Sequence, residues 1–164
     1  MRAKNNLEAK IKNLNALKRI SLRLKAQGKK IVFTNGCFDL LHYGHVKYLQ
    51  DAREKGDILV VAVNSDLSVK KIKGNKRPVV NQKDRIRTIA ALESVDYVTL
   101  FREDTPIKVI KLIRPDILVK GADWDKASIV GGDFVTSHNG KVSTIKLAKG
   151  RSTTDLINKI VKAF

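Results

Sequence analysis

The feature that most restricts the fold of this chain is an unbroken apolar run at 58–63, ILVVAV, with polar residues on both sides. A strand that is apolar on both faces leaves no face for water, so both faces have to be covered. Parallel sheets flanked by helices cover their strands in this way, whereas antiparallel sheets commonly leave one face in water. The run therefore predicts an α/β fold in which this strand lies inside a parallel sheet.

The segments on either side of this run support the same fold class. Short apolar runs alternate with helical patterns, which is typical of a Rossmann-like parallel sheet with right-handed crossovers and helices on both faces. We expect five strands, at 30–35, 57–66, 96–101, 115–121 and 140–147, and helices at 44–56, 82–95, 105–114 and 152–164. The segment at 69–81, VKKIKGNKRPVVN, is predicted to be a basic loop. Ligands of such sheets bind at the carboxyl ends of the strands.

Residues 1–29 form a separate segment in front of this pattern. Apolar residues recur at spacings of three and four over 5–27, which predicts one amphipathic helix with a basic outer face that ends at Gly28. We therefore divide the chain into an N-terminal basic amphipathic helix (1–29) and a main domain (30–164). Packing on the domain, dimerisation and contact with a membrane surface are all compatible with such a helix.

The chain is strongly basic, with 33 Lys and Arg against 16 Asp and Glu and a formal net charge of +17. This excess favours anionic partners such as nucleotides, sugar phosphates or nucleic acid, although a lysine-rich solvated surface would also account for it. Aromatic residues make up only 5%, and no stacking platform or basic recognition helix is evident, so we expect no nucleic-acid partner.

Cysteine use and hydropathy indicate the compartment. A single cysteine excludes an internal disulfide, and the first residues, MRAKNNLEAK, lack the apolar region of a secretory signal. No run approaches the ~18 apolar residues of a membrane span. These observations predict a cytoplasmic protein without a membrane partner.

The stretch at 34–45, TNGCFDLLHYGH, joins the first predicted strand to a helix that we expect to begin near Gly44. Free N–H groups and the partial positive charge of a helix N-terminus favour phosphate there. His42 and His45 are three residues apart, so they can lie on the same side of the first turn as a pair of donors for phosphate oxygens. Gly44 between them leaves room for phosphates to approach the backbone.

Other interpretations of this junction have less support. A zinc site would need further ligands, and Cys37 alone is a poor third. No G-x-G-x-x-G follows the first strand, and the segment at 148–153, AKGRST, lacks the first glycine and the lysine of a Walker loop. The two histidines as incidental polar residues of a turn would require the neighbouring Gly36 and Asp39 to be coincidental as well.

The segment GCFDLLHYGH resembles the HxGH signature of the nucleotidyltransferase superfamily, whose members transfer a nucleoside monophosphate to a phosphorylated acceptor on a Rossmann-like fold. Further segments over 30–164 resemble, in order, the adenylyltransferase domain of the bifunctional ADP-heptose synthases: VNSD, KGNKRPV, DRIRTIAALESVDYV, EDTP, RPDILVKGADW, IVGGDFV and GRSTTDLI. In many bacteria that domain is fused to a sugar kinase. This sequence has no kinase part, so it resembles a stand-alone adenylyltransferase supplied by a separate heptose kinase.

The resemblance implies transfer of AMP from ATP to D-glycero-β-D-manno-heptose 1-phosphate, giving ADP-heptose and pyrophosphate. It implies that His42 and His45 are catalytic, with Lys47 as an added charge. It assigns nucleotide contacts to those histidines and to Asn35, Gly36, Cys37, Phe38, Asp39, Gly44, Gly121, Asp123, Trp124, Ser152, Thr153 and Thr154. Many members of the superfamily carry an arginine at the position of Ile157, for which Arg151 or a loop lysine would substitute.

The same resemblance bears on the acceptor, the metal and the assembly. The predicted basic loop is a natural place for the acceptor's phosphate, and polar residues at the end of the second strand could bond sugar hydroxyls. We expect acceptor contacts from Asn64, Asp66, Lys73 and Arg77. Mg²⁺ is expected as a bridge between ATP phosphates, without a dedicated protein metal site. Dimers are common in the superfamily, which allows a homodimer.

Three alternatives stay open at this stage. Glycerol-3-phosphate cytidylyltransferases resemble the chain in their histidine and GADW-like segments, but the arginine of their cytosine-reading loop aligns with Leu147 here. Other nucleotidyltransferases, such as archaeal FAD synthase, are further candidates. A basic nucleic-acid-binding module would be the alternative outside the enzymes, and steeply salt-dependent nucleic-acid binding would favour it.

Overall fold

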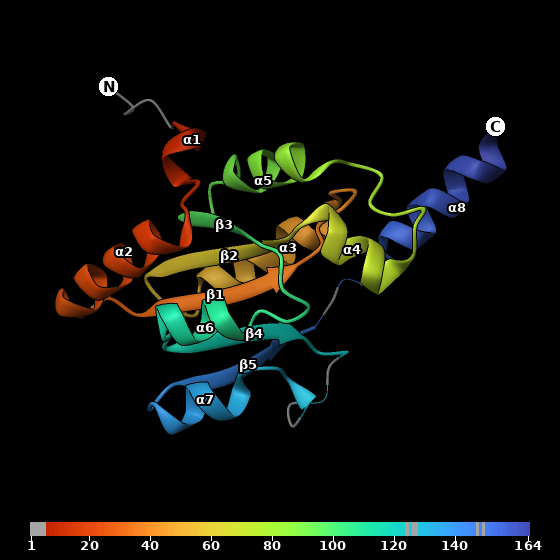
Figure 1. Ribbon diagram of the computed structural model, residues 1–164. Helices are drawn as coiled ribbons and strands as arrows, with labels where there is room; N and C mark the ends of the chain where they lie inside the picture. The colour runs from red at the N-terminus through yellow and green to blue at the C-terminus, as the bar shows by residue number, and fades with distance from the viewer. Residues whose placement is uncertain (1–5, 124, 126–127, 147, 149) are drawn as a thin grey trace.

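A computed structural model describes residues 6–123, 125, 128–146, 148 and 150–164. Five parallel strands form one sheet in the order β3-β2-β1-β4-β5 (Figure 1). The strands are β1 (Ile31–Gly36), β2 (Ile58–Asn64), β3 (Tyr97–Phe101), β4 (Ile117–Gly121) and β5 (Lys141–Ile145). The helices are α1 (Leu7–Lys10), α2 (Leu14–Ala26), α3 (Tyr43–Arg53), α4 (Asp66–Lys73), α5 (Gln82–Ala90), α6 (Ile107–Ile113), α7 (Gly132–Ser137) and α8 (Thr153–Ala163). The predicted Rossmann-like architecture is confirmed.

Helices cover both faces of the sheet, as the apolar run at 58–63 predicts. Val61 and Val63 of β2 pack in a core with α3 and α5, and Val60 and Ala62 pack in a second core with α2, α6 and α7. Figure 1 shows α2, α6 and α7 on one side of the sheet and α3 on the other. The strand order reverses between β1 and β4, because β2 and β3 continue to one side and β5 to the other. This switch point is where α/β sheets bind ligands.

The single helix predicted over 5–27 is wrong, because the segment contains two helices joined at the edge of the sheet. Ile11 forms a parallel bridge to Val98 of β3, and the amide of Lys12 donates to the Val98 carbonyl at 2.8 Å. Asn13 then starts α2, since its side chain accepts from the amide of Ala16. The apolar stripe serves both cores, with Leu7 and Ile11 on the α5 side and the α2 residues on the other. The segment thereby covers the exposed edge of β3.

Two further elements differ from the prediction. The basic run at 69–81 begins as a helix, because Ser65 caps α4 by accepting from the amide of Ser68, and Val69 anchors the helix in the core. Lysines in the last turn of a helix also interact favourably with its dipole. Helix α7 was not expected from the sequence; its first residue, Gly132, is buried, as is Val135. No helix in the described ranges is both long and apolar enough to cross a membrane.

Candidate active site

Strand β1 ends in a turn that folds Phe38 back over Gly36. Phe38 has a φ of 45°, in the left-handed region that non-glycine residues seldom adopt. A Cβ added at Gly36 would lie 3.0 Å from the Phe38 ring, so a larger residue there would displace the ring. The ring packs edge-on against His45, with centroids 5.5 Å apart. The turn therefore forms a wall that supports one of the two histidines.

The histidine pair lies at the N-terminus of α3. His42 is the residue that precedes the first turn and His45 lies within that turn. Their rings stack with centroids 3.9 Å apart and an interplanar angle of 21°, so they share one side of the helix, as their spacing predicts. The Nδ1 atoms of both rings are buried and have no hydrogen-bond partner among the described residues. Because buried polar atoms are normally paired, two such atoms side by side point to a ligand that supplies oxygens.

Gly44 lies close to two side chains in the unliganded protein. A Cβ at this position would lie 3.0 Å from the His42 ring and 3.1 Å from Cβ of Arg151. The space that glycine leaves is therefore taken by the protein's own side chains, which meet directly above the first turn of α3. The lack of a side chain at Gly44 allows the His42 imidazole to lie close to Arg151, and the approach of phosphates to the backbone here stays a prediction.

Burial sets the protonation of the pair. It lowers the pKa of His45 to about 4, with a further contribution from His42. Burial also lowers the pKa of His42, and the positive charge of Arg151 acts in the same direction. Both imidazoles are consequently neutral near pH 7 in the unliganded protein. A neutral imidazole has one N–H, so each ring can offer one donor to an anionic ligand.

The lowered pKa of His45 predicts a specific loss of stability in acid. Between about pH 6.5 and pH 4 the unfolded chain binds a proton at His45 that the folded protein does not, so the free energy of unfolding falls as the pH falls. We expect this loss to be larger in the wild type than in His45→Gln by about 1–3 kcal/mol. Urea unfolding at about pH 7 and about pH 4 measures it, with His138→Gln at the exposed third histidine as the control. Equal pH dependence in the wild type and His45→Gln would contradict the assignment.

Tyr48 fixes α3 on the sheet. Its phenol donates to the carbonyl of Val119 at 3.2 Å and lies 2.8 Å from the hydroxyl of Thr34, so it joins the helix to β4 and β1. Burial raises the pKa of Tyr48 to about 12. The phenol stays neutral at physiological pH and holds the histidine helix against the carboxyl ends of the two central strands.

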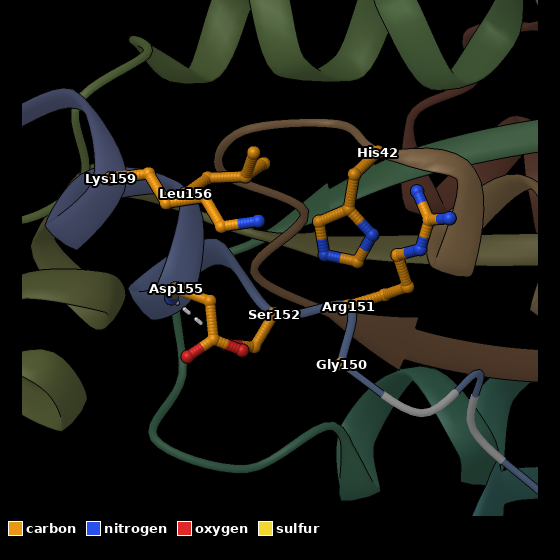
Figure 2. Close-up of a pocket in the computed structure, with 7 residues that line it drawn as sticks. All are labelled: His42, Gly150, Arg151, Ser152, Asp155, Leu156 and Lys159. Atoms are coloured by element: carbon orange, nitrogen blue, oxygen red, sulfur yellow. Dashed lines mark hydrogen bonds between the residues drawn. The ribbon is translucent and has the colours of Figure 1, made fainter. Parts of the chain in front are cut away.

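A pocket of about 300 Å³ lies between His42 and the start of α8. Figure 2 shows the His42 imidazole between Arg151 and the first turn of α8. The Arg151 guanidinium also lies over the ring of Tyr43, 5.7 Å from its centroid. The remaining lining residues are Gly150, Ser152, Asp155, Leu156 and Lys159. Ser152 is the N-cap of α8 and accepts from the amide of Asp155 at 3.0 Å, as predicted for a cap.

The charges in this pocket differ from the expectation of a plain phosphate-binding helix start. Asp155 adds a carboxylate, which would repel phosphate, while Arg151 and Lys159 add two cations. Thr153 and Thr154 begin α8 but do not line the pocket. The positive charge of this pocket therefore comes mainly from the two basic side chains.

In the unliganded protein Lys47 is engaged elsewhere on α3 and does not show the catalytic role predicted for it. It forms an ion pair with Asp51 one turn along α3, and this hydrogen bond raises the pKa of Lys47. Its side chain is 49% exposed. The catalytic contribution of Lys47 stays a prediction, and it would require exchange of Asp51 for a ligand.

Asp39 is occupied inside the protein. Its carboxylate accepts from the amides of Val79 and Val80 and from Nε of Arg77 at 2.6 Å. Burial alone would raise the pKa of Asp39, but these bonds outweigh it and hold the pKa below its usual value. Asp39 and Arg77 thus clip the segment after α4 onto the β1 turn. The nucleotide contact expected of Asp39 and the acceptor contact expected of Arg77 stay predictions, and the structure gives both side chains a positioning role.

Arg85 holds the strand ends of the candidate site together, and the sequence analysis did not single it out. Its side chain is buried and donates to the carbonyls of Cys37, Asn64 and Val80 and to the carboxylate of Asp66 at 2.7 Å. One guanidinium therefore holds together the ends of β1 and β2, the start of α4 and the segment before α5. A charged residue on the inner side of a predicted amphipathic helix is the signal that could have identified it.

The remaining predicted acceptor residues lie at the end of β2. The side-chain amide of Asn64 donates to Ser68 at 3.0 Å, and Asp66 pairs with Arg85 and accepts from the amide of Gln82. Both are engaged internally, so their sugar contacts stay predictions. Lys73 ends α4, is exposed, and lies close enough to Cys37 to lower the pKa of that thiol, although burial outweighs this and raises it.

Strand β4 pairs with β1 and ends with Lys120 and Gly121, and Asp123 follows two residues later. Lys120 donates to the side-chain oxygen of Asn35 at 2.5 Å. Trp124, predicted to stack on the base, lies outside the described residues. No three His, Cys, Asp or Glu side chains within the described ranges lie together so as to hold a metal ion.

A Rossmann-like parallel sheet with two neutral imidazoles at a helix N-terminus beside its switch point is the arrangement of a nucleotidyltransferase. Residues 33–146 match the family described as cytidylyltransferase-like. The chain belongs to this family and is a nucleotidyltransferase.

Relatives and solved structures agree with this assignment. The protein named bifunctional protein HldE of Geobacter sulfurreducens is 52% identical over 157 residues, which are 96% of this chain and 32% of that protein. The chain thus spans about a third of the length of the curated relatives it matches. The crystal structure of a lipopolysaccharide core biosynthesis protein from Thermoplasma volcanium has a TM-score of 0.61 at 29% identity and covers 76% of this chain and 100% of its own. Pantoate-beta-alanine ligase from Francisella tularensis, at 17% identity, TM-score 0.61 and coverage of 93% and 77%, shares the fold.

Proposed function

We propose that this protein transfers AMP from ATP to a sugar 1-phosphate, with D-glycero-β-D-manno-heptose 1-phosphate as the acceptor. The observation that carries the proposal is the stacked pair His42 and His45, whose buried Nδ1 atoms lack partners at the N-terminus of α3. The HldE relatives support the heptose phosphate as acceptor and the adenylyl group as the one transferred. The sugar phosphate would come from a kinase reaction, whether on a separate protein or a joined one.

The reaction needs positioning and charge neutralisation more than acid–base chemistry. An oxygen of the sugar phosphate attacks the α-phosphorus of ATP and forms a new P–O bond. The bond from the α-phosphorus to the bridging oxygen breaks, and pyrophosphate leaves with the electron pair. Since a phosphate monoester has a second pKa near ~6, the nucleophile is already an anion at neutral pH and needs no general base. The two imidazoles donate to oxygens whose charge grows at the pentacoordinate phosphorus.

The pocket beside His42 is the proposed site of the β- and γ-phosphates. Arg151 and Lys159 supply two cations there, and the start of α8 adds the partial positive charge of a helix N-terminus. We propose that Arg151 takes the role of the arginine that Ile157 replaces. Mg²⁺ would arrive with ATP and neutralise its phosphates, and Asp155 is the carboxylate lining this pocket that could hold it with phosphate oxygens and water.

The base and the ribose are proposed to lie over the end of β4, near Gly121 and Asp123. The same proposal includes the nucleotide contacts predicted for Asn35, Cys37, Thr153 and Thr154. A homodimer, which the resemblance to the superfamily allows, stays a prediction.

The test is pyrophosphate release with each nucleoside triphosphate against heptose 1-phosphate, glycerol 3-phosphate and FMN. We expect turnover only with ATP and the heptose phosphate. Turnover with CTP and glycerol 3-phosphate would keep the chemistry and overturn the substrate. The matched family is described as cytidylyltransferase-like, so CTP is the main competitor of ATP in this test. Nucleotide binding without turnover in every combination would overturn the proposed reaction.

A further inference from the structure

We propose that Tyr43 is a positioning residue whose aromatic ring holds the guanidinium of Arg151 at the phosphate pocket. This inference rests on the proposed function, which places the β- and γ-phosphates of ATP in that pocket. Tyr43 is the first residue of α3 and lies between His42 and Gly44 in the segment HYGH. The Arg151 guanidinium lies over its ring, 5.7 Å from the ring centroid, which is within the range of a cation–π contact.

Tyr43 is exposed, although it is a large aromatic residue. Its exposed fraction is 57%, whereas Tyr48, Leu49 and Ala52 on the same helix are buried against the sheet. Packing in the core therefore does not account for an aromatic side chain at this position. The face of a tyrosine ring carries partial negative charge, which attracts a cation placed over it. The ring thus interacts with Arg151 through the surface that suits a guanidinium.

Arg151 has little else to hold it in place. It is exposed and directly precedes Ser152, the N-cap of α8, and none of the described residues of α8 is buried. No carboxylate in the described part of the chain forms an ion pair with Arg151. A long flexible side chain loses conformational freedom when it binds a ligand, and this loss weakens the binding. A ring that already fixes the guanidinium reduces this cost.

The ring holds the cation at the pocket rather than away from it. The close approach of Arg151 to the His42 ring over Gly44 places its side chain on the histidine side of the pocket, as Figure 2 shows for the two labelled side chains. Burial lowers the pKa of His42, and the charge of Arg151 acts in the same direction, which is consistent with a nearby guanidinium. Three consecutive residues therefore define the place of one cation: a ring below it, a glycine that leaves space and an imidazole beside it.

The first experiment replaces the ring and keeps the cation. We expect Tyr43→Leu to raise the KM for ATP by about 2- to 5-fold, the fold-change that corresponds to a cation–π contact at an exposed site. The kcat and the KM for the sugar phosphate should change by less than about 2-fold, because the arginine is held for triphosphate binding. Tyr43→Phe should keep the wild-type constants, since it retains the ring. Leu22→Ala, at an exposed apolar residue of α2, is the control and should leave all three constants unchanged.

A double-variant cycle identifies the route by which the ring acts. Arg151→Met should raise the KM for ATP by about 10-fold, the usual effect of losing a charge-assisted hydrogen bond. In the Arg151→Met background Tyr43→Leu should add nothing, because a ring that acts through the guanidinium then has nothing to position. A further rise of the same size in the double variant would mean that the ring contacts the nucleotide itself, and it would overturn the proposal. An unchanged KM for ATP in Tyr43→Leu would overturn it too.

A measurement without turnover keeps this inference separate from the proposed function. The ring current of Tyr43 should shift the proton resonances of the Arg151 side chain upfield, and these resonances are assigned by their absence in Arg151→Met. The shift should persist in Tyr43→Phe and disappear in Tyr43→Leu, which should also bind inorganic tripolyphosphate more weakly than the wild type. Both effects in a protein that turns over no pair of substrates would retain the positioning role and reject the proposed function. Turnover with Arg151 resonances that do not respond to Tyr43→Leu would retain the function and reject this inference.

Discussion

His45→Ala is expected to lower kcat by about 10²–10³-fold while the protein stays folded. In the proposed mechanism this side chain is one of two donors to the place where negative charge develops, and the loss of one such donor typically removes about 3–4 kcal/mol of transition-state stabilisation. The KM for ATP should change much less, because we propose that Arg151 and Lys159 also hold the ground-state triphosphate. The measurement is pyrophosphate release under saturating substrates, together with thermal unfolding of each variant.

The third histidine provides the matched control for this prediction. His138 ends α7, is exposed, and interacts with the carbonyl of Phe134 and the hydroxyl of Ser137. His138→Ala should therefore retain full activity. His42→Ala should resemble His45→Ala, and the double variant should lose less than the product of the two single effects, because residues that act as a unit are non-additive. Full additivity would indicate that the two rings act independently.

Amide substitutions can identify which ring nitrogen acts. An asparagine amide reaches about as far as Nδ1 of histidine and a glutamine amide about as far as Nε2. Both Nδ1 atoms are buried and without described partners, so we expect His45→Asn to keep more activity than His45→Gln. The reverse order would mean that Nε2 faces the phosphate. An activity of His45→Ala within about threefold of the wild type would remove the histidine pair from the mechanism.

The main features of the fold could be predicted from the sequence, because they depend on local patterns. An apolar run covered on both faces belongs in a parallel sheet, and the alternation of strands and helices defines the order of elements. The errors occur where tertiary contacts override local periodicity. The stripe over 5–27 has helical spacing throughout, but Ile11 bonds to Val98 on a strand almost ninety residues away. No local pattern contains that contact.

In the candidate site too, some features could be predicted from the sequence and others could not. The placement of His42 and His45 follows from their spacing on one helix, so it could be predicted. The ends of β1, β2 and β4 come together only through the sheet, and the partners of each polar side chain there could not be predicted. The sequence predicts a nucleotide contact for Asp39, but it does not predict that Asp39 accepts from the amides of Val79 and Val80, forty residues along the chain.

Arg85→Met is expected to lower the free energy of unfolding by about 2–3 kcal/mol, the usual cost of leaving buried hydrogen-bonding groups without a partner. The side chain of Arg85 is fully buried, and its loss removes the hydrogen bonds to three backbone carbonyls and the ion pair with Asp66, whose carboxylate keeps the bond from the Gln82 amide. Urea unfolding measures the change. Arg87→Met, two residues along the same helix, removes an exposed pair with Glu8 and should lose at most about 1 kcal/mol.

A positive charge alone at position 85 should not restore the stability that Arg85→Met loses. Arg85→Lys keeps a cation but not the planar fork that reaches several acceptors at once, so we expect it to recover less than half of the lost stability. Asp66→Asn combined with Arg85→Met should be more stable than the sum of the single effects, because the double change leaves no unpaired buried charge. Since Arg85 also holds the carbonyl of Cys37, the β1 turn that supports Phe38 and His45 depends on it. Activity measured where Arg85→Met is still folded should therefore fall as well, and unchanged activity there would show that the turn holds its shape without this arginine.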